Sequence, residues 1–173
     1  MKRFIGMHAC ALVLLCSAFV DTHAAQSSPA PGATSAVSHQ LAASMTALAD
    51  RADAVWNRRD AAGMTALYAP DATSTIGGAI RLKGRAEILA HFTTSFAGLP
   101  EGMTHRTVVK RIEPLGDMYA VDSAVSIEMA DGAQGKRVLR EFFTFSLVRP
   151  VAGGWEFVAV RATPLGAAPR ANG

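Results

Sequence analysis

Three ionisable side chains interrupt apolar, strand-like stretches in the second half of the chain: His105, Asp122 and Arg161. His105 alternates with Thr107 and Val109, and a histidine in such a position is suited to general-base chemistry near neutral pH. Asp122 stands within "YAVDSAV" and is a second candidate base if its face of the strand turns toward a cavity. The alternatives are a solvent-facing histidine at a strand edge and a carboxylate on a solvated or dimer-facing surface.

The stretch "GWEFVAVRAT", residues 154–163, places an arginine among aromatic residues. If the strand alternates regularly, its face carries Trp155, Phe157, Arg161 and Thr163. Arginine cannot shuttle protons near neutral pH, but it binds carboxylates, phosphates and enolates firmly. Arg161 is therefore predicted either to anchor an anionic group inside a cavity, or to pair with an acid or reach water at the strand end.

Three further residues are candidates for the wall of a pocket. His91 lies three residues after Ile88, at the edge of the apolar face of a predicted helix. It either lines a pocket or is a half-buried histidine bonded to backbone. Trp56 and Tyr68 are predicted as an aromatic wall, a role that is compatible with packing in the core.

Motifs for metals and cofactors are not found in the sequence. His39, His91 and His105 show no metal-ligand spacing, and no cysteine lies near them. The chain also has no GxSxG elbow, no GxxxxGK[ST] loop and no GxGxxG after a strand. We therefore expect neither a metal nor a cofactor.

The first 25 residues are typical of a signal peptide. Lys2 and Arg3 precede the apolar run "ALVLLCSAFV", which is too short to span a bilayer, and "THAAQ" suits signal peptidase. Both cysteines, Cys10 and Cys16, fall in this segment, so the remaining chain can form no disulfide. We predict an exported protein, periplasmic or secreted, that has no membrane association after cleavage.

Charge and composition indicate one globular domain. The chain carries 17 Lys and Arg against 14 Asp and Glu, and no basic run, which argues against nucleic acid as a partner. Residues 26–38 and 166–173 are rich in small residues and are predicted as a flexible leader and tail. Residues 39–165 remain, roughly 125 in number, enough for one domain with a real core.

Periodicity predicts three helices followed by a run of strands. An amphipathic helix from His39 to about residue 58 is indicated by apolar residues at Leu41, Met45, Leu48, Ala52, Val55 and Trp56. A short second helix begins after the N-cap Asp60, carries Tyr68 on its inner face and stops at Pro70, and a third spans residues 85–96. Strands are predicted as a hairpin over 71–84 around Gly77 and Gly78, and over 104–113, 118–129, 138–149 and 155–163.

This order of elements favours an α+β fold in which a strongly bent, mainly antiparallel sheet wraps on the helices and encloses a space. The segments "WNRRDAAGMTALYAPDA", "LKGRAEILAHF" and "GGWEFVAVRAT" resemble the nuclear transport factor 2-like superfamily over about residues 41–163. Among its members the chain is most similar to SnoaL-like domains of the SgcJ/EcaC type. The resemblance implies a cone-shaped roll, an apolar pocket at its open end, and a homodimer formed through the sheet.

The resemblance also bears on the candidate residues. Laid over the ketosteroid isomerases of this superfamily, the base aspartate falls on Ile76 and the oxyanion tyrosine on Ala52, which argues against isomerase chemistry of that kind. The second oxyanion acid matches Glu141 in "REFFTF", where apolar surroundings would favour its neutral form. The subgroup ends in His-Asn-Thr, whereas this chain has Arg161, Ala162 and Thr163.

Two functions follow as hypotheses. The first is an exported pocket protein, without a cofactor, that binds a small apolar molecule carrying an anionic or carbonyl group. Its predicted ligand-binding residues are Trp56, Tyr68, His91, Phe143, Trp155, Arg161 and Thr163. The second is a cofactor-free acid–base enzyme of isomerase, dehydratase, cyclase or hydrolase type, with His105 or Asp122 as base and Glu141 with Arg161 stabilising an oxyanion.

Overall fold

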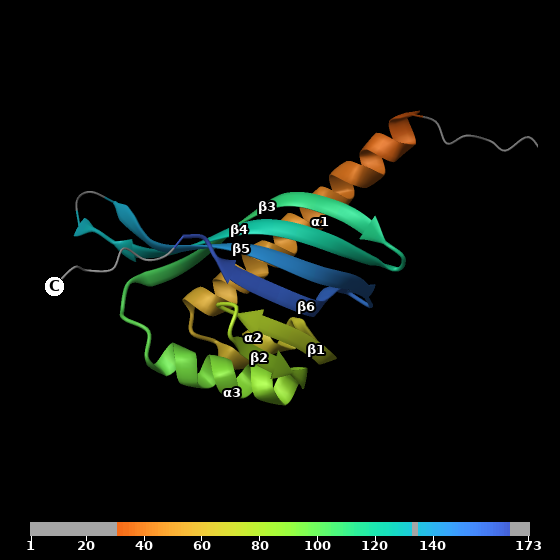
Figure 1. The fold of residues 1–173 in the computed structure, drawn as a ribbon. Coiled ribbons are helices and arrows are strands. Elements are labelled where there is room, and N and C mark those ends of the chain that lie inside the picture. The colour runs from red at the N-terminus through yellow and green to blue at the C-terminus, as the bar shows by residue number, and fades with distance from the viewer. Residues whose placement is uncertain (1–30, 133–134, 167–173) are drawn as a thin grey trace, which may run out of the picture.

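The computed structural model describes residues 31–132 and 135–166 of the chain (Figure 1). The helices are α1 (Pro31–Asn57), α2 (Ala61–Ala66) and α3 (Gly84–Ala97). The strands are β1 (Tyr68–Ile76), β2 (Ile80–Lys83), β3 (Met103–Leu115), β4 (Met118–Ala130), β5 (Lys136–Val151) and β6 (Gly154–Pro164). The predicted signal peptide, residues 26–30 of the predicted leader and residues 167–173 of the tail lie outside the described residues.

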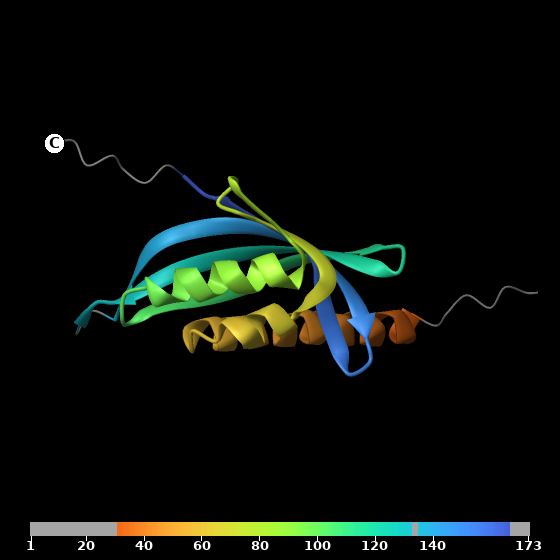
Figure 2. The same cartoon turned by 90° about the horizontal axis from the view of Figure 1, so that it is seen from below.

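The six strands form one mixed sheet in the order β2-β1-β6-β5-β4-β3. Neighbouring strands are antiparallel except for β1 and β6, which run parallel. The sheet curls without closing, and α1 and α3 cover its concave side (Figure 2). The α+β fold with a curved, mainly antiparallel sheet wrapped on helices is therefore confirmed. We call the concave side the inner face and the opposite side the outer face.

Two helix boundaries differ from those predicted. α1 begins at Pro31 rather than at His39, and proline is well tolerated in the first turn of a helix because its missing N–H has no partner there. α2 ends at Ala66, so Tyr68 opens β1 instead of extending the helix. Pro70 is accommodated where the pairing of β1 with β6 shifts register between Tyr68 and Thr73, a position that needs no ladder hydrogen bond from it.

Local signals account for the start of α2 and for the turn between β1 and β2. Asp60 caps α2, because its Oδ1 accepts a hydrogen bond from the Gly63 N–H at 2.7 Å. The β1–β2 hairpin turns at Gly77 and Gly78, whose φ angles of 62° and 77° favour glycine. Both features were predicted from the sequence, and together they place α2, β1 and β2 around one end of the sheet.

The core consists of two apolar clusters on the inner face. The larger joins the end of α1 to α2, α3 and β1 through Ala52, Trp56, Met64, Tyr68, Ala69, Ala72, Ile88, Phe92 and Phe96. The second joins the middle of α1 to the sheet through Met45, Leu48, Val121 and Val148. Burying each of the large side chains in these clusters contributes roughly 1.5–3 kcal/mol, so packing on the inner face stabilises the curvature of the sheet.

No helix within residues 31–132 and 135–166 is long and apolar enough to cross a membrane.

Candidate functional site

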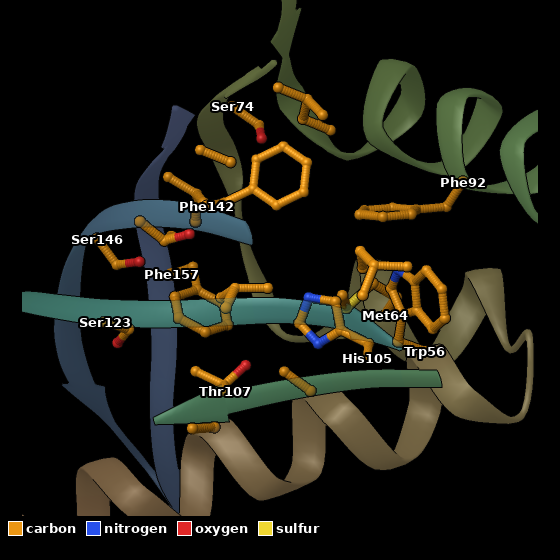
Figure 3. Close-up of a pocket in the computed structure, with 18 of the residues that line it drawn as sticks. Trp56, Met64, Ser74, Phe92, His105, Thr107, Ser123, Phe142, Ser146 and Phe157 are labelled. Atoms are coloured by element: carbon orange, nitrogen blue, oxygen red, sulfur yellow. The ribbon is translucent and has the colours of Figure 1, made fainter. Parts of the chain in front are cut away.

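A cavity of about 560 Å³ lies between the inner face of the sheet and the helices (Figure 3). Its walls come from α1, α2, α3 and all strands except β2. Most lining side chains are aliphatic or aromatic, and the lining residues that can carry a positive charge at neutral pH are Arg140, which is always charged, and the histidines His91 and His105. No aspartate or glutamate is among the described residues that line it. The volume lies in the range of small-molecule sites, and the charge at its wall is positive or neutral.

His105 on β3 is held by an aspartate of α1. Its Nδ1 lies 2.7 Å from Oδ1 of Asp53, and the two side chains are 16% and 15% exposed. Asp53 also accepts hydrogen bonds from the backbone N–H and the hydroxyl of Thr107, each at 2.7 Å. Because a carboxylate only accepts, Nδ1 carries the proton of the neutral imidazole. Nε2 has no hydrogen-bond partner in the described part of the chain and remains available to a ligand.

The backbone of β3 is clamped by the same helix. Asn57, one turn after Asp53, accepts a hydrogen bond from the His105 N–H at 2.7 Å and donates its amide to the His105 carbonyl at 3.1 Å. β3 is an edge strand, so the N–H groups of His105 and Thr107 have no neighbouring strand on that side. Asp53 and Asn57 therefore supply hydrogen-bond partners to these backbone groups of the free edge, and together they fix the position of His105.

Trp56 packs against both His105 and a cation. Its ring is 5.2 Å from the His105 ring, and the Arg59 guanidinium lies 4.7 Å from its ring centroid. Arg59 donates to the carbonyls of Met103 at 2.8 Å and Pro100 at 3.2 Å, which joins the end of α1 to the start of β3. Arg59 has a φ of 60°, a left-handed conformation that costs energy for a residue with a side chain. These contacts fix Trp56 as a wall of the cavity next to His105.

Tyr68 and Ser74 supply buried hydroxyl groups from β1. Burial, only partly offset by the Ser74 side chain, raises the pKa of Tyr68 to about 12, so its hydroxyl stays protonated. The Ser74 hydroxyl lies close enough to Tyr68 to offset part of this rise in pKa. Ser74 Oγ is nevertheless buried and has no hydrogen-bond partner within the described residues. An unpaired buried hydroxyl at a cavity wall is a group that a polar ligand atom can satisfy.

His91 on α3 lines the cavity opposite the sheet. Its Nε2 lies 3.3 Å from the hydroxyl of Ser95, one turn further along the helix. Burial lowers the pKa of His91, because the charged imidazolium loses hydration. His91, Trp56 and Tyr68 thus all lie in the cavity wall, as the sequence predicted for each of them.

Arg161 and Thr163 do not line the cavity, because β6 contains a bulge. The pairs Val148–Phe157 and Leu147–Ala159 are consecutive, so Val158 is an extra residue opposite β5. An extra residue exchanges the two faces of a strand beyond it. Phe157 therefore points into the cavity, whereas Arg161 and Thr163 take the outer face.

Four other predicted residues also lie away from the cavity. Asp122 faces outward and pairs with Arg111 at 3.2 Å, and Glu141 is exposed on the same face. Phe143 is 42% exposed there, while its neighbour Phe142 occupies the cavity instead. Trp155 stacks edge-on against Tyr119 at 5.4 Å, next to the smaller core cluster. The proposed convergence of Asp122, Glu141 and Arg161 with His105 is not present.

Asp53, Asn57 and Arg140 were not among the site residues predicted from the sequence. Asp53 and Asn57 are spaced i, i+4 on either side of Trp56, which places them at the margin of the apolar stripe of α1. That spacing was the available signal, but a polar pair beside an apolar stripe is usually solvated. Arg140 shares the alternation of Phe142, Thr144 and Ser146 toward the cavity and is itself exposed, so it lies at the mouth. Within the same described residues, no cluster of three or more His, Cys, Asp or Glu side chains could hold a metal ion.

Solved structures with the same architecture define the class of fold. An NTF2-like protein with a cystatin-like fold from Novosphingobium aromaticivorans matches with a TM-score of 0.65 and 19% identity, covering 82% of this chain and 94% of that one. A ketosteroid isomerase-like protein from Erwinia carotovora atroseptica matches at 0.56 and 20%, covering 73% and 97%. A domain of unknown function from Nostoc punctiforme matches at 0.61 and 18%, covering 82% of each chain. The fold is the cone-shaped NTF2-like roll.

The family is established by sequence. The model of the SnoaL-like domain matches residues 49–155, more than half of the chain, so the protein belongs to the SnoaL-like family. No functionally curated protein matches the chain.

Proposed function

We propose that the protein binds a small apolar molecule that carries an anionic or carbonyl group, without a cofactor. The observation that carries this proposal is the cavity of about 560 Å³, with apolar walls and no carboxylate among its described lining residues. An apolar body would bury against Trp56 and Phe92, and the charge at the wall favours an electron-rich polar group on the ligand.

Arg140 and His105 are the proposed polar contacts. Arg140 lies at the mouth, where its guanidinium can bind a carboxylate through two parallel hydrogen bonds. His105 lies inside, where Nε2 accepts from a hydroxyl when the ring is neutral and donates to a carbonyl when it is protonated. Arg140 thus takes the anchoring role that was predicted for Arg161 from the sequence.

Native mass spectrometry of detergent-free protein is the direct test. A mass excess that disappears on denaturation identifies a bound ligand, and Trp fluorescence titration then measures the affinity of an apolar carboxylic acid and of its methyl ester. Arg140→Gln is expected to weaken the acid about tenfold and the ester little. The control is Arg137→Gln, which removes an exposed arginine of the same strand that pairs with Asp131 at 3.9 Å. Equal affinities of wild type and Arg140→Gln for the acid would refute the anchor.

A second candidate function is acid–base catalysis on a similar molecule, and the Asp53–His105 pair favours it. Nε2 of His105 would accept a proton from the bound molecule, and the Asp53 carboxylate would stabilise the resulting imidazolium. Asp53 touches no ligand in this scheme and is a positioning residue.

Deuterium incorporation tests this second function. A panel of apolar ketones is incubated with the protein in deuterated water and analysed by mass spectrometry. Exchange at the carbon beside the carbonyl should be abolished in His105→Gln and retained in His91→Gln. If the wild type accelerates exchange in no ketone that it binds, the protein is a binder of these molecules and not an enzyme for this step.

Three further proposals concern the setting of the protein. We assign it to the SgcJ/EcaC-type subgroup, to the exported fraction of the cell, and to a homodimer formed through the outer face of the sheet. Phe143 and Val108, 42% and 36% exposed, lie in one register row across β5, β4 and β3 and support such a contact. Light scattering should give twice the monomer mass for the wild type and the monomer mass for Phe143→Asp.

A further inference from the structure

A second, shallow groove of about 420 Å³ lies beside the cavity, on β1, β2 and β6. It is bordered by the side chains of Thr73, Thr75, Arg81, Lys83, Glu87 and Arg161, among others. The bulge in β6 turns Arg161 into this groove. The groove thus adjoins the cavity across β1, where Ser74 lines both, and it contains three cationic residues that the proposed function does not use.

Strand register brings the cations together on the outer face. Thr75 pairs with Arg81 of β2 on one side and with Arg161 of β6 on the other, and Thr73 pairs with Lys83. Paired residues of neighbouring strands point to the same face. Arg81 and Arg161 are two strands apart, about 10 Å between backbones, which two long guanidinium side chains can close around one small anion.

Hydroxyl groups form the floor between the cations. Arg161 Nη1 lies 3.3 Å from Thr75 Oγ1, so the guanidinium is drawn over the β1 strand. Since Thr75 Oγ1 accepts from Arg161, its own proton is free to donate outward. Thr73, two residues earlier on the same face, offers a second hydroxyl. A groove with cationic walls and hydroxyl donors at its floor matches an acceptor with several oxygens.

The charges in the groove are not neutralised by the protein. Arg81, Lys83 and Arg161 form no ion pair within 4.0 Å with an acidic side chain of the described residues. Glu87 is the carboxylate of the groove, and its Oε2 accepts the backbone N–H of Lys83 at 2.7 Å. Three positive groups beside one carboxylate leave a net positive site, where an anion reduces the repulsion among the cations.

We propose that this groove binds a phosphate group. Arginines on two strands supply paired N–H donors from opposite sides, Lys83 supplies a point charge, and the threonine hydroxyls bond the remaining oxygens. A tetrahedral phosphate has enough oxygens to satisfy these donors at once, which a single carboxylate has not. The phosphate is either a free ion or part of a lipid headgroup, because both present the same oxygens.

The test is a titration of the isotopically labelled full-length mature chain with inorganic phosphate at constant ionic strength, followed by amide NMR. Saturable shifts are expected at residues 73–75, 81–83 and 161. Arg161→Gln and Arg81→Gln should each weaken binding about tenfold. Arg106→Gln is the matched control, since Arg106 is an exposed strand arginine outside the groove, and it should bind as the wild type does. Unchanged amide spectra elsewhere show that each variant is folded.

A second arm separates the two sources of phosphate. Vesicles of phosphatidylcholine that contain phosphatidic acid, and control vesicles of phosphatidylcholine alone, are tested by sedimentation with the same variants. Binding of free phosphate that depends on Arg161, without binding to vesicles, identifies a soluble anion, and vesicle binding that depends on Arg161 identifies a lipid headgroup. The proposal is overturned if neither probe binds, or if Arg106→Gln weakens binding as much as Arg161→Gln does.

Discussion

The sharpest consequence of the structure is that Asp53→Asn should destabilise the fold and disturb His105 at once. The Asp53 carboxylate accepts three hydrogen bonds, from the Thr107 N–H, the Thr107 hydroxyl and Nδ1 of His105, each at 2.7 Å. Asparagine presents an N–H₂ group in place of one carboxylate oxygen. At least one of these donors then faces another donor and loses its acceptor.

The expected cost follows from these contacts. A partly buried N–H left without an acceptor costs about 1–3 kcal/mol, and the bonds that remain lose the assistance of the negative charge. We expect the free energy of unfolding to fall by about 2–4 kcal/mol, a large part of the 5–15 kcal/mol typical of a domain. Where the amide N–H₂ group takes the place of Oδ1, it faces Nδ1 of His105, and the neutral His105 ring should then populate its other tautomer.

Two measurements check this prediction. Urea denaturation followed by circular dichroism gives the loss of stability, and imidazole ¹⁵N chemical shifts give the tautomer of His105. Asp50→Asn is the control, since Asp50 is exposed on the same helix and its replacement should change stability by less than about 0.5 kcal/mol. If Asp53→Asn matches Asp50→Asn in stability and leaves the tautomer unchanged, the clamp on β3 does not act as inferred.

Two further predictions concern α3. Burial lowers the pKa of His91 below the 6.5 of the unfolded chain, so the unfolded state binds more protons and stability should fall as the pH drops below about 6.5 toward the folded pKa. Unfolding free energies between pH 5 and 8 should show a flatter profile for His91→Gln, and identical profiles would contradict the assignment. Ile88 is 0% exposed, so Ile88→Ala should lower the free energy of unfolding by about 2–5 kcal/mol, as measured by thermal denaturation. Leu89 is 40% exposed, so Leu89→Ala should lower it by less than about 1 kcal/mol. Equal losses would show that the core does not extend to this turn.

Much of the fold could be predicted because its signals are local. The stripe of apolar residues defined the face of α1, the capping aspartate located the start of α2, and the Gly77–Gly78 pair located the hairpin. The end of α2 was misplaced because Leu67 and Tyr68 fit both a helical stripe and a buried strand. Packing of Tyr68 against Phe157, with ring centroids 5.4 Å apart, favours the strand. This contact is tertiary, so a local sequence pattern does not reveal it.

The site could be predicted only in part, because its geometry depends on long-range pairing. Asp53 and His105 are separated by 52 residues, and nothing in either segment specifies that α1 lies along the edge of β3. The bulge at Val158 falls within an apolar run and has no glycine to mark it. One unpaired residue moved Arg161 from the expected cavity to the groove on the other face, which a pattern of period two cannot reveal.

The contacts that protect the sheet edge are also those that build the site. α1 occupies the position that a further strand would take beside β3, and Asp53 and Asn57 bind backbone groups that such a strand would otherwise pair. The side chain of His105 is therefore fixed by the same bonds that prevent another chain from adding to the edge. A substitution that frees His105 must expose this edge, so loss of ligand affinity and a tendency to associate through β3 should arise together. Phe142 and Arg140 line the cavity without taking part in the protection of the edge. Substitutions there can therefore change the ligand preference of the pocket more readily than substitutions of His105 can.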